Sequence, residues 1–254
     1  MRFGARAHSL EDVLFLIQAS FDFVEIDWKE PQALRAQLPE LGSFRADHGI
    51  TYLAHGPNEG YPFNADQIAA EMTPVVHQLL DMAPELGIAL YTQHLWLDPR
   101  FVSAEVIAHK LDILEMWSTH AARAGVTLCI ENLSEHADHL APAFQRVPGL
   151  GLTLDLGHGE ILSQLNASFA LIERFADRIR HVHLHDNCGG STEGDDLHLP
   201  IGAGRVDFPA ILEALRAAGY DAGYSFEMDL EHVQQSRDEV RRILDGLVSR
   251  VPSA

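Results

Sequence analysis

The chain has 254 residues, of which 46% are hydrophobic, so it is long enough to bury the core of one large domain. Its 37 acidic residues against 18 basic ones give a formal net charge of -19, which disfavours loose binding to polyanions such as DNA or acidic membranes. The two cysteines, Cys129 and Cys188, are too few for a disulfide framework, which favours a reducing compartment. The sequence shows no signal-peptide core and no apolar run that could span a bilayer, so we expect a cytoplasmic protein.

Apolar runs typical of β-strands alternate with helical hydrophobic spacing along the whole chain. The predicted strands cover residues 1–5, 22–27, 50–55, 88–94, 126–131, 150–155, 179–185 and 222–228. The clearest helical spacing covers residues 64–86, 104–122 and 208–215. About eight alternations predict a parallel sheet closed into a (β/α)8 TIM barrel, formed as a single domain by residues 1–254. We expect the final Val-Pro-Ser-Ala to be a frayed end.

Glycines stand where predicted helices end and strands begin. They are Gly49, Gly87, Gly125 and Gly219. A glycine at this place ends a helix in the left-handed conformation, which other residues adopt only at a cost. These positions therefore predict short turns from helix into strand.

Seven of the predicted strands end on a histidine, an aspartate or a glutamate. These residues are Glu25, His55, His94, Glu131, Asp155, His183 and Glu227. Any one of them could be a hydrogen-bonded core residue or a helix cap, but caps are a mixture of Ser, Thr, Asn and Asp. In a TIM barrel the strand ends meet at one mouth, where the chemistry sits. Carboxylates that meet there need a cation to hold them together, so the pattern predicts a metalloenzyme.

Two local clusters add donors to this mouth. In Asp155-Leu-Gly-His158 a carboxylate and an imidazole lie three residues apart across a strand-to-helix turn, which lets both face one ion or two neighbouring ions. In Asp196-Leu-His198 the two side chains can chelate one ion.

Three histidines, His181, His183 and His185, alternate along the seventh predicted strand and therefore share one face. One or two of them can lie in the metal layer, and the others then support the ligands or pack below them. Cys188 follows closely and is more readily a loop thiol than a soft ligand.

The motifs at these places resemble those of the xylose-isomerase-like barrel superfamily over nearly the whole chain. They are Ile130-Glu131-Asn132, Leu154-Asp155-Leu-Gly-His158, His183-Leu-His-Asp186 followed by Asp196-Leu-His198-Leu-Pro-Ile-Gly202, and Phe226-Glu227. This superfamily includes sugar isomerases and epimerases and the endonuclease IV family of abasic-site nucleases.

The resemblance implies ligands for two branches of the superfamily. In the epimerases four ligands hold one divalent ion, and they match Glu131, Asp155, His183 and Glu227. In the nucleases further ligands build a three-zinc cluster, and they match His55, His94, His158, Asp196 and His198. Since this chain has both sets, the ligands alone do not separate the branches.

The two branches imply different chemistry for the same ligands. Carboxylates with one imidazole suit Mn²⁺, Mg²⁺ or Co²⁺, and added imidazoles shift the preference toward Zn²⁺. In an epimerase the ion polarises a carbonyl and its neighbouring hydroxyl while Glu131 and Glu227 transfer the proton on opposite faces of the sugar. In a nuclease the ions generate hydroxide, and the two glutamates mainly bridge them.

The loops at the mouth favour a small substrate. Residues 56–63 carry an acid and no base, and residues 187–196 carry three acids and no base, whereas a nuclease needs basic residues to grip DNA. Tyr61 and Phe63 could wedge into DNA or cover a sugar. We therefore expect a small sugar-like substrate in preference to nucleic acid, and no membrane partner. A non-catalytic metal-binding protein is the third alternative. An oligomer is compatible with the sequence.

A Schiff-base mechanism is disfavoured because the chain has two lysines. Lys110 lies in a predicted helix, and Lys29 follows the second predicted strand. The absence of a Gly-x-x-x-x-Gly-Lys loop, and of arginine after the third and seventh strands, weakens the case for a phosphorylated substrate.

Overall fold

The computed structural model describes residues 1–248, and the predicted frayed end at residues 251–254 lies outside them. Eight parallel strands form a closed barrel in which each strand pairs with the next and β8 pairs with β1. The strands are β1 (Arg2–Ala7), β2 (Phe23–Asp27), β3 (Thr51–His55), β4 (Leu90–Gln93), β5 (Thr127–Glu131), β6 (Gly151–Asp155), β7 (Ile179–Leu184) and β8 (Gly223–Phe226). The predicted single-domain (β/α)8 barrel is confirmed.

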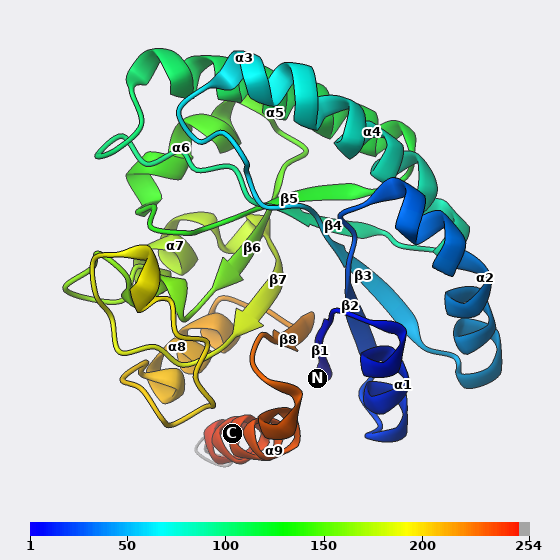
Figure 1. The fold of residues 1–254 in the computed structure, drawn as a ribbon. Coiled ribbons are helices and arrows are strands. Elements are labelled where there is room, and N and C mark those ends of the chain that lie inside the picture. Colours follow the sequence, from blue (N-terminus) through cyan, green and yellow to red (C-terminus); the bar gives the residue numbers. More distant parts are fainter. Residues whose placement is uncertain (249–254) are drawn as a thin grey trace.

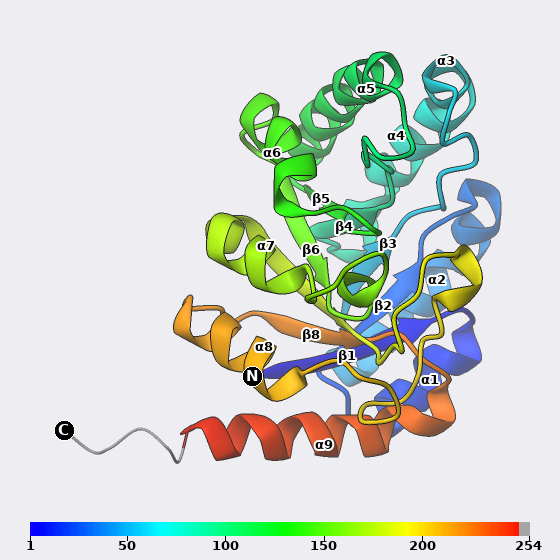
Figure 2. The same cartoon turned by 90° about the vertical axis from the view of Figure 1, so that its left-hand side faces the viewer.

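The helices surround the strands, as Figure 1 shows. They are α1 (Leu10–Gln18), α2 (Pro31–His48), α3 (Ala65–Gln67), α4 (Thr73–Met82), α5 (Ala104–Arg123), α6 (Ala137–Arg146), α7 (Ser168–Phe175), α8 (Phe208–Ala217) and α9 (Leu230–Val248). The last helix packs against α8 and β8 along one side of the barrel (Figure 2). No helix among residues 1–248 is long and apolar enough to cross a membrane.

The helix predicted over residues 64–86 is one helical run with changes of pitch. A π-helical turn (Ile68–Met72) separates α3 from α4, and a 3-10 turn (Ala83–Leu86) follows α4. The changes fall beside Pro74 and Pro84, which have no N–H with which to continue the α-helical ladder. The N–H of Thr73 instead reaches back to the carbonyl of Ile68.

The four predicted glycine caps are confirmed. Gly49, Gly87, Gly125 and Gly219 have φ angles of 68°, 67°, 73° and 83°. Strand ends differ from the prediction by a few residues: His94 and Glu227 directly follow β4 and β8, and β1 continues to Ala7. Each difference leaves the side chain at the same mouth, because one residue beyond a strand is still at its end.

One aromatic ring fills the lower part of the barrel. A Cβ atom added to Gly4 would lie 2.2 Å from the Phe23 ring, and one added to Gly223 would lie 2.8 Å from it. Only glycine leaves room for Phe23 at these two positions. Above Phe23 the inward residue of β2 is Glu25, so the interior turns from apolar to charged toward the mouth.

Candidate metal centre

Four strand-end residues from neighbouring strands meet at the mouth of the barrel. Glu131, Asp155, His183 and Glu227 offer donor atoms that all lie within 4.8 Å of one another, and all four are buried. The Nδ1 atom of His183 is 3.0 Å from Glu131, 3.4 Å from Glu227 and 3.8 Å from Asp155. The parallel register brings them together, because each residue ends or directly follows its strand.

This donor set fits a divalent cation. Three carboxylates and one imidazole are a ligand set for Mn²⁺, Mg²⁺, Co²⁺ or Zn²⁺. The Oδ2 atom of Asp155 is buried without a hydrogen-bond partner, although its other oxygen accepts from the backbone of His158 at 2.6 Å. A buried carboxylate oxygen without a partner is costly in a protein interior, and a bound ion removes that cost.

A second group forms around the other oxygen of Glu131. The Nε2 atoms of His55 and His94 lie 3.2 and 2.9 Å from Glu131 Oε2, and the two imidazoles are 4.9 Å apart. Both histidines therefore point into the barrel mouth, as the sequence predicted. Because Glu131 belongs to this group and to the first one, its carboxylate can bridge two ions.

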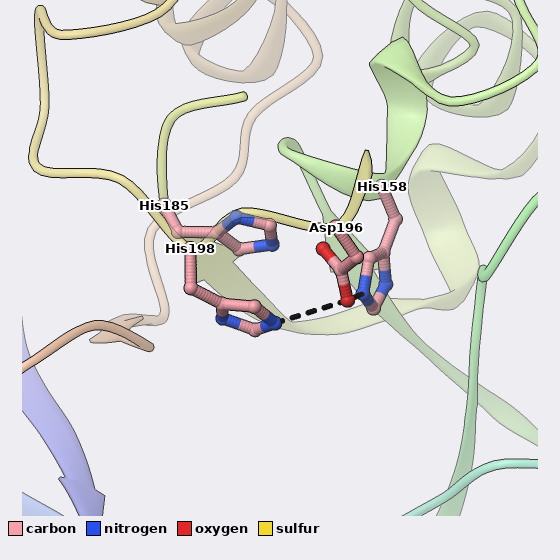
Figure 3. Close-up of side chains that lie close together, drawn as sticks. All are labelled: His158, His185, Asp196 and His198. Atoms are coloured by element: carbon pink, nitrogen blue, oxygen red, sulfur yellow. Dashed lines mark hydrogen bonds and ion pairs between the residues drawn. The ribbon is translucent and has the colours of Figure 1, made fainter. Parts of the chain in front are cut away.

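A third group lies toward the rim and is shown in Figure 3. Asp196 lies between two imidazoles, with its Oδ2 atom 3.2 Å from His158 and 3.1 Å from His198. His185 stacks on His198 with ring centroids 4.0 Å apart. The Oδ1 atom of Asp196 and the Nδ1 atom of His185 are buried without hydrogen-bond partners. The Nε2 atom of His185 lies 3.0 Å from the Oδ1 atom of Asp155. Three imidazoles and one carboxylate are a donor set suited to Zn²⁺.

The three histidines of β7 and its end divide among these layers. His183 lies in the first group and His185 in the third, whereas His181 lies below both and packs edge-on against Phe23. Glu25 lies between the layers, 2.9 Å from His181 and 3.0 Å from the Nε2 atom of His183. Glu25 thereby fixes the ring of His183 with Nδ1 toward the first group, which is the usual task of a carboxylate behind a histidine ligand.

The charges of the first group hold one another ionised. Burial alone would raise the pKa of Glu131, but the charges of His183 and His94 and two hydrogen bonds keep it well below the usual value. Burial would lower the pKa of His183, but the charges of Glu227, Glu25 and Glu131 keep it well above the usual value. The carboxylates therefore demand positive charge at this place, which a cation can supply.

Sequence reasoning missed Arg6, which comes from the one strand without a predicted site residue. Its Nη1 atom donates to Glu227, and its Nε atom is 2.9 Å from Asp27. Burial would raise the pKa of Glu227, but the charges of His183 and Arg6 outweigh it and lower that pKa. The available signal was an arginine directly after the first predicted strand, a position equivalent to those of the predicted acidic residues and histidines.

The expectation that no arginine follows the seventh strand is wrong. The segment between β7 and α8 is longer than expected and contains Arg205, whose Nε atom is 2.9 Å from Glu160. Lys29 pairs with Asp27 at 2.9 Å. Both arginine and lysine are thus present at this face, but each is paired with an acid. Cys188 is exposed and belongs to none of the donor groups formed by the described residues.

A cavity of about 650 Å³ opens above the donors and is large enough for a small organic substrate. Arg6, Lys29, His94 and Glu227 line it together with Asp196. Each of the three donor groups therefore has at least one member that lines this cavity.

Comparisons with known proteins agree with this architecture. A model of the family described as xylose isomerase-like TIM barrel matches residues 14–247. An uncharacterized protein of Methanocaldococcus jannaschii is 33% identical over 103 residues, which is 40% of this chain and 34% of that protein. An L-ribulose 3-epimerase of Mesorhizobium japonicum is 24% identical over 220 residues, 83% of this chain and 72% of that enzyme. The first of these matches therefore spans about a third of the relative's length.

A solved structure described as a D-tagatose 3-epimerase-like protein superimposes with a TM-score of 0.83. It is 21% identical in sequence, and the match covers 98% of this chain and 99% of that one. At 21% sequence identity, this similarity shows a shared fold and does not by itself show a shared activity.

Proposed function

The chain belongs to the xylose isomerase-like TIM barrel family, and from that premise we propose that it is a divalent-metal-dependent isomerase or epimerase of a small sugar or sugar derivative. The relative named L-ribulose 3-epimerase and the structure described as D-tagatose 3-epimerase-like support ketoses as the substrate class. The observation that carries the proposal is the pair Glu131 and Glu227, whose carboxylates come from the ends of β5 and β8 and belong to one donor group beside the cavity that Glu227 lines.

In this proposal Glu131, Asp155, His183 and Glu227 hold the ion. The bound ion would act as a Lewis acid toward a substrate carbonyl and its neighbouring hydroxyl. One glutamate takes the proton from the carbon beside the carbonyl and later releases it to solvent, while the other takes up a proton from solvent and returns it to that carbon on the opposite face.

The surroundings of the two glutamates suit these roles. His55 and His94 hold one oxygen of Glu131, and Arg6 holds one oxygen of Glu227. Each carboxylate is therefore fixed in position, which is what a positioned base requires. Arg6 also keeps Glu227 ionised, so that Glu227 can accept a proton.

A second candidate function is zinc-dependent hydrolysis of a phosphodiester. It is favoured by one observation: all nine predicted ligands fall into three neighbouring donor groups, and Glu131 is shared by two of them. An imidazole-rich cluster of this kind favours Zn²⁺. The pairing of the mouth's basic residues with acids leaves few free cations for a nucleic acid backbone, which is why we place this function second.

Metal analysis of protein purified without chelator, followed by two assays, tests the proposal. The first assay incubates L-ribulose, D-tagatose and D-psicose with the metal-loaded protein in D₂O and follows deuterium at carbon 3. The second measures nicking of duplex DNA at an abasic site. Deuterium incorporation that chelator abolishes supports the isomerase; nicking without exchange into any sugar supports the hydrolase and overturns it.

A further inference from the structure

A second cavity of about 430 Å³ lies beside the cavity above the metal donors. The two meet at a common wall formed by Asn58, His94, His158 and Asp196, which line both. The first cavity is lined mainly by charged residues and histidines, whereas the lining of the second includes the apolar residues Trp96, Phe101, Leu133, Ile161 and Leu162. The first cavity, of about 650 Å³, has room for a single polar sugar ring. The apolar second cavity therefore suits a further group of the ligand.

Trp96 is held rigidly in the wall of this second cavity. Its backbone N–H donates to Glu59 at 2.8 Å, and its carbonyl accepts from Lys110 at 2.8 Å. Glu59 and Lys110 themselves form a buried ion pair of 2.6 Å. The indole N–H donates to Ser134 at 2.9 Å. Three anchors on one residue fix the plane of the indole before any ligand arrives.

The fixed indole is part of an aromatic platform. Phe101 stacks on Trp96 with ring centroids 5.1 Å apart and planes at 22°, and Phe63 meets Trp96 edge-on at 5.9 Å. Phe101 and Phe63 are 45% and 61% exposed, so the platform keeps apolar surface in contact with solvent. A rigid, partly exposed aromatic surface inside a cavity suits the apolar face of a sugar ring or an aryl group.

The lining of the second cavity also contains a residue with a strained backbone, Leu162. Leu162 has a φ of 54°, a conformation that favours glycine. Its N–H donates to the Gly190 carbonyl at 2.8 Å, and its own carbonyl accepts from Arg100 at 3.1 Å. Besides Ser20 and Leu162, the non-glycine residue with positive φ among residues 1–248 is His198, which lies in the candidate metal centre. Strain held in place by neighbours gathers at functional sites, so Leu162 marks this wall as one.

We propose that Trp96, Phe101 and Leu162 form a second subsite, which binds a sugar ring or aryl group joined to the sugar that reacts. The preferred substrate is then a disaccharide in which the reacting ketose carries a second sugar on a hydroxyl other than the anomeric one, so that its carbonyl stays free, and not a free monosaccharide. This inference rests on the proposed sugar chemistry at the neighbouring metal centre, but the subsite itself uses none of the metal donors.

Tryptophan fluorescence can measure binding at this subsite without catalysis. The chain has three tryptophans, and Trp28 and Trp117 are fully buried, so a ligand that touches the indole of Trp96 changes mainly its emission. The metal-loaded protein is titrated with D-fructose and with lactulose and isomaltulose, in which a second sugar ring is attached to a fructose whose carbonyl stays free. We expect lactulose and isomaltulose to bind about tenfold more tightly than D-fructose, which is the scale of one aromatic contact.

Two variants separate the subsite from a structural role. Trp96→Phe keeps a ring and should retain part of the tenfold preference, as measured by isothermal calorimetry. Leu162→Gly removes the side chain and relieves the strained φ, so its Tm should not fall while its preference for the two larger ligands is lost. Leu165→Gly is the matched control, because Leu165 is 70% exposed and does not line the cavity.

The subsite is overturned by equal binding of D-fructose and the two larger ligands, by no detectable binding of any of the three, or by an unchanged preference in both variants. Deuterium exchange into a ketose is measured separately. Tight binding of the larger ligands through Trp96 without any exchange leaves the subsite standing and sinks the proton-transfer proposal. Exchange into free ketoses without a preference for the larger ligands supports the proton-transfer proposal and overturns the subsite.

Discussion

At the scale of single residues, the site depends on how each carboxylate is held. Glu131 lies within 3.5 Å of four imidazoles, those of His55, His94, His158 and His183. Glu227 pairs with Arg6 and lies 3.4 Å from His183 and 3.9 Å from His55. The positive charges of these partners lower the pKa of both glutamates although burial alone would raise it.

Glu227→Gln should keep the fold, because the amide is nearly isosteric, and lower turnover by roughly 10²–10⁴, the usual scale for a lost general base. Turnover and solvent-deuterium exchange are measured on the ketose that the unaltered protein converts. If excess metal restores most of the activity, Glu227 acts as a ligand and not as a base. Glu71→Gln, an exposed glutamate on the helical run after β3, is the control.

Arg6 should set the acid limb of the pH–rate profile. Burial would raise the pKa of Glu227, and the positive charges of His183 and Arg6 lower it. Removing the guanidinium with Arg6→Met therefore raises that pKa, and activity that needs ionised Glu227 is lost at a higher pH on the acid side. Arg6→Lys keeps the charge and should shift the limb less. Identical acid limbs in the three proteins would contradict this role.

At the scale of elements, two loops of the mouth are tied to one helix. Glu59, in the loop after β3, and the backbone of Trp96, in the loop after β4, both meet Lys110 on α5. Arg100 extends the network by donating to Asp98 and to the carbonyl of Leu162. A pair of buried charges thus sets the relative position of loops that carry cavity residues.

Lys110→Met should destabilise the protein by about 3–5 kcal/mol, because it leaves the Glu59 carboxylate buried without its partner. The double variant Lys110→Met with Glu59→Gln should cost less than the sum of the single changes, with a coupling of about 1–3 kcal/mol. Urea unfolding of the four proteins measures the cycle. Strict additivity would show that the pair does not act as a unit.

At the scale of the whole molecule, the barrel collects acidic groups that repel one another. Glu25, Glu131, Asp155 and Glu227 lie in adjoining layers of one interior, and all are buried. Within the protein only a few cations, such as Arg6 and protonated histidines, offset them. Binding of metal should therefore be coupled to the stability of the entire barrel.

Removing metal with a chelator should lower the Tm, and adding back the ion should restore it. An ion present at 100 times its dissociation constant stabilises the folded state by about 2.7 kcal/mol. For a chain of this size that corresponds to roughly 5–10 °C in calorimetry. Asp155→Asn should shrink the difference between loaded and stripped protein. A Tm that is independent of Mn²⁺, Co²⁺ and Zn²⁺ would contradict the metal centre.

The sequence by itself determined the barrel and the residues at its mouth. Strand and helix periods differ, and left-handed glycines mark the joints, so local pattern suffices to predict eight alternating units. Because parallel strands of a closed barrel all end on one face, a charged residue at each strand end implied a shared site. The pattern thus predicted seven strand-end residues at one mouth, and the resemblance to the xylose-isomerase-like superfamily singled out Glu131, Asp155, His183 and Glu227 among them as ligands.

Only the tertiary structure decided how these residues divide and what surrounds them. Alternation along the strand put His181, His183 and His185 on one face, and only the barrel interior assigned each of them to its own layer. Lys110 was indistinguishable from a surface helix residue until α5 packed it against Glu59. Loops fold back by contacts between residues far apart in the chain, and no local period records such contacts. The pairing of Arg6 with Glu227 and the cavity beside Trp96 belong to this second kind of information.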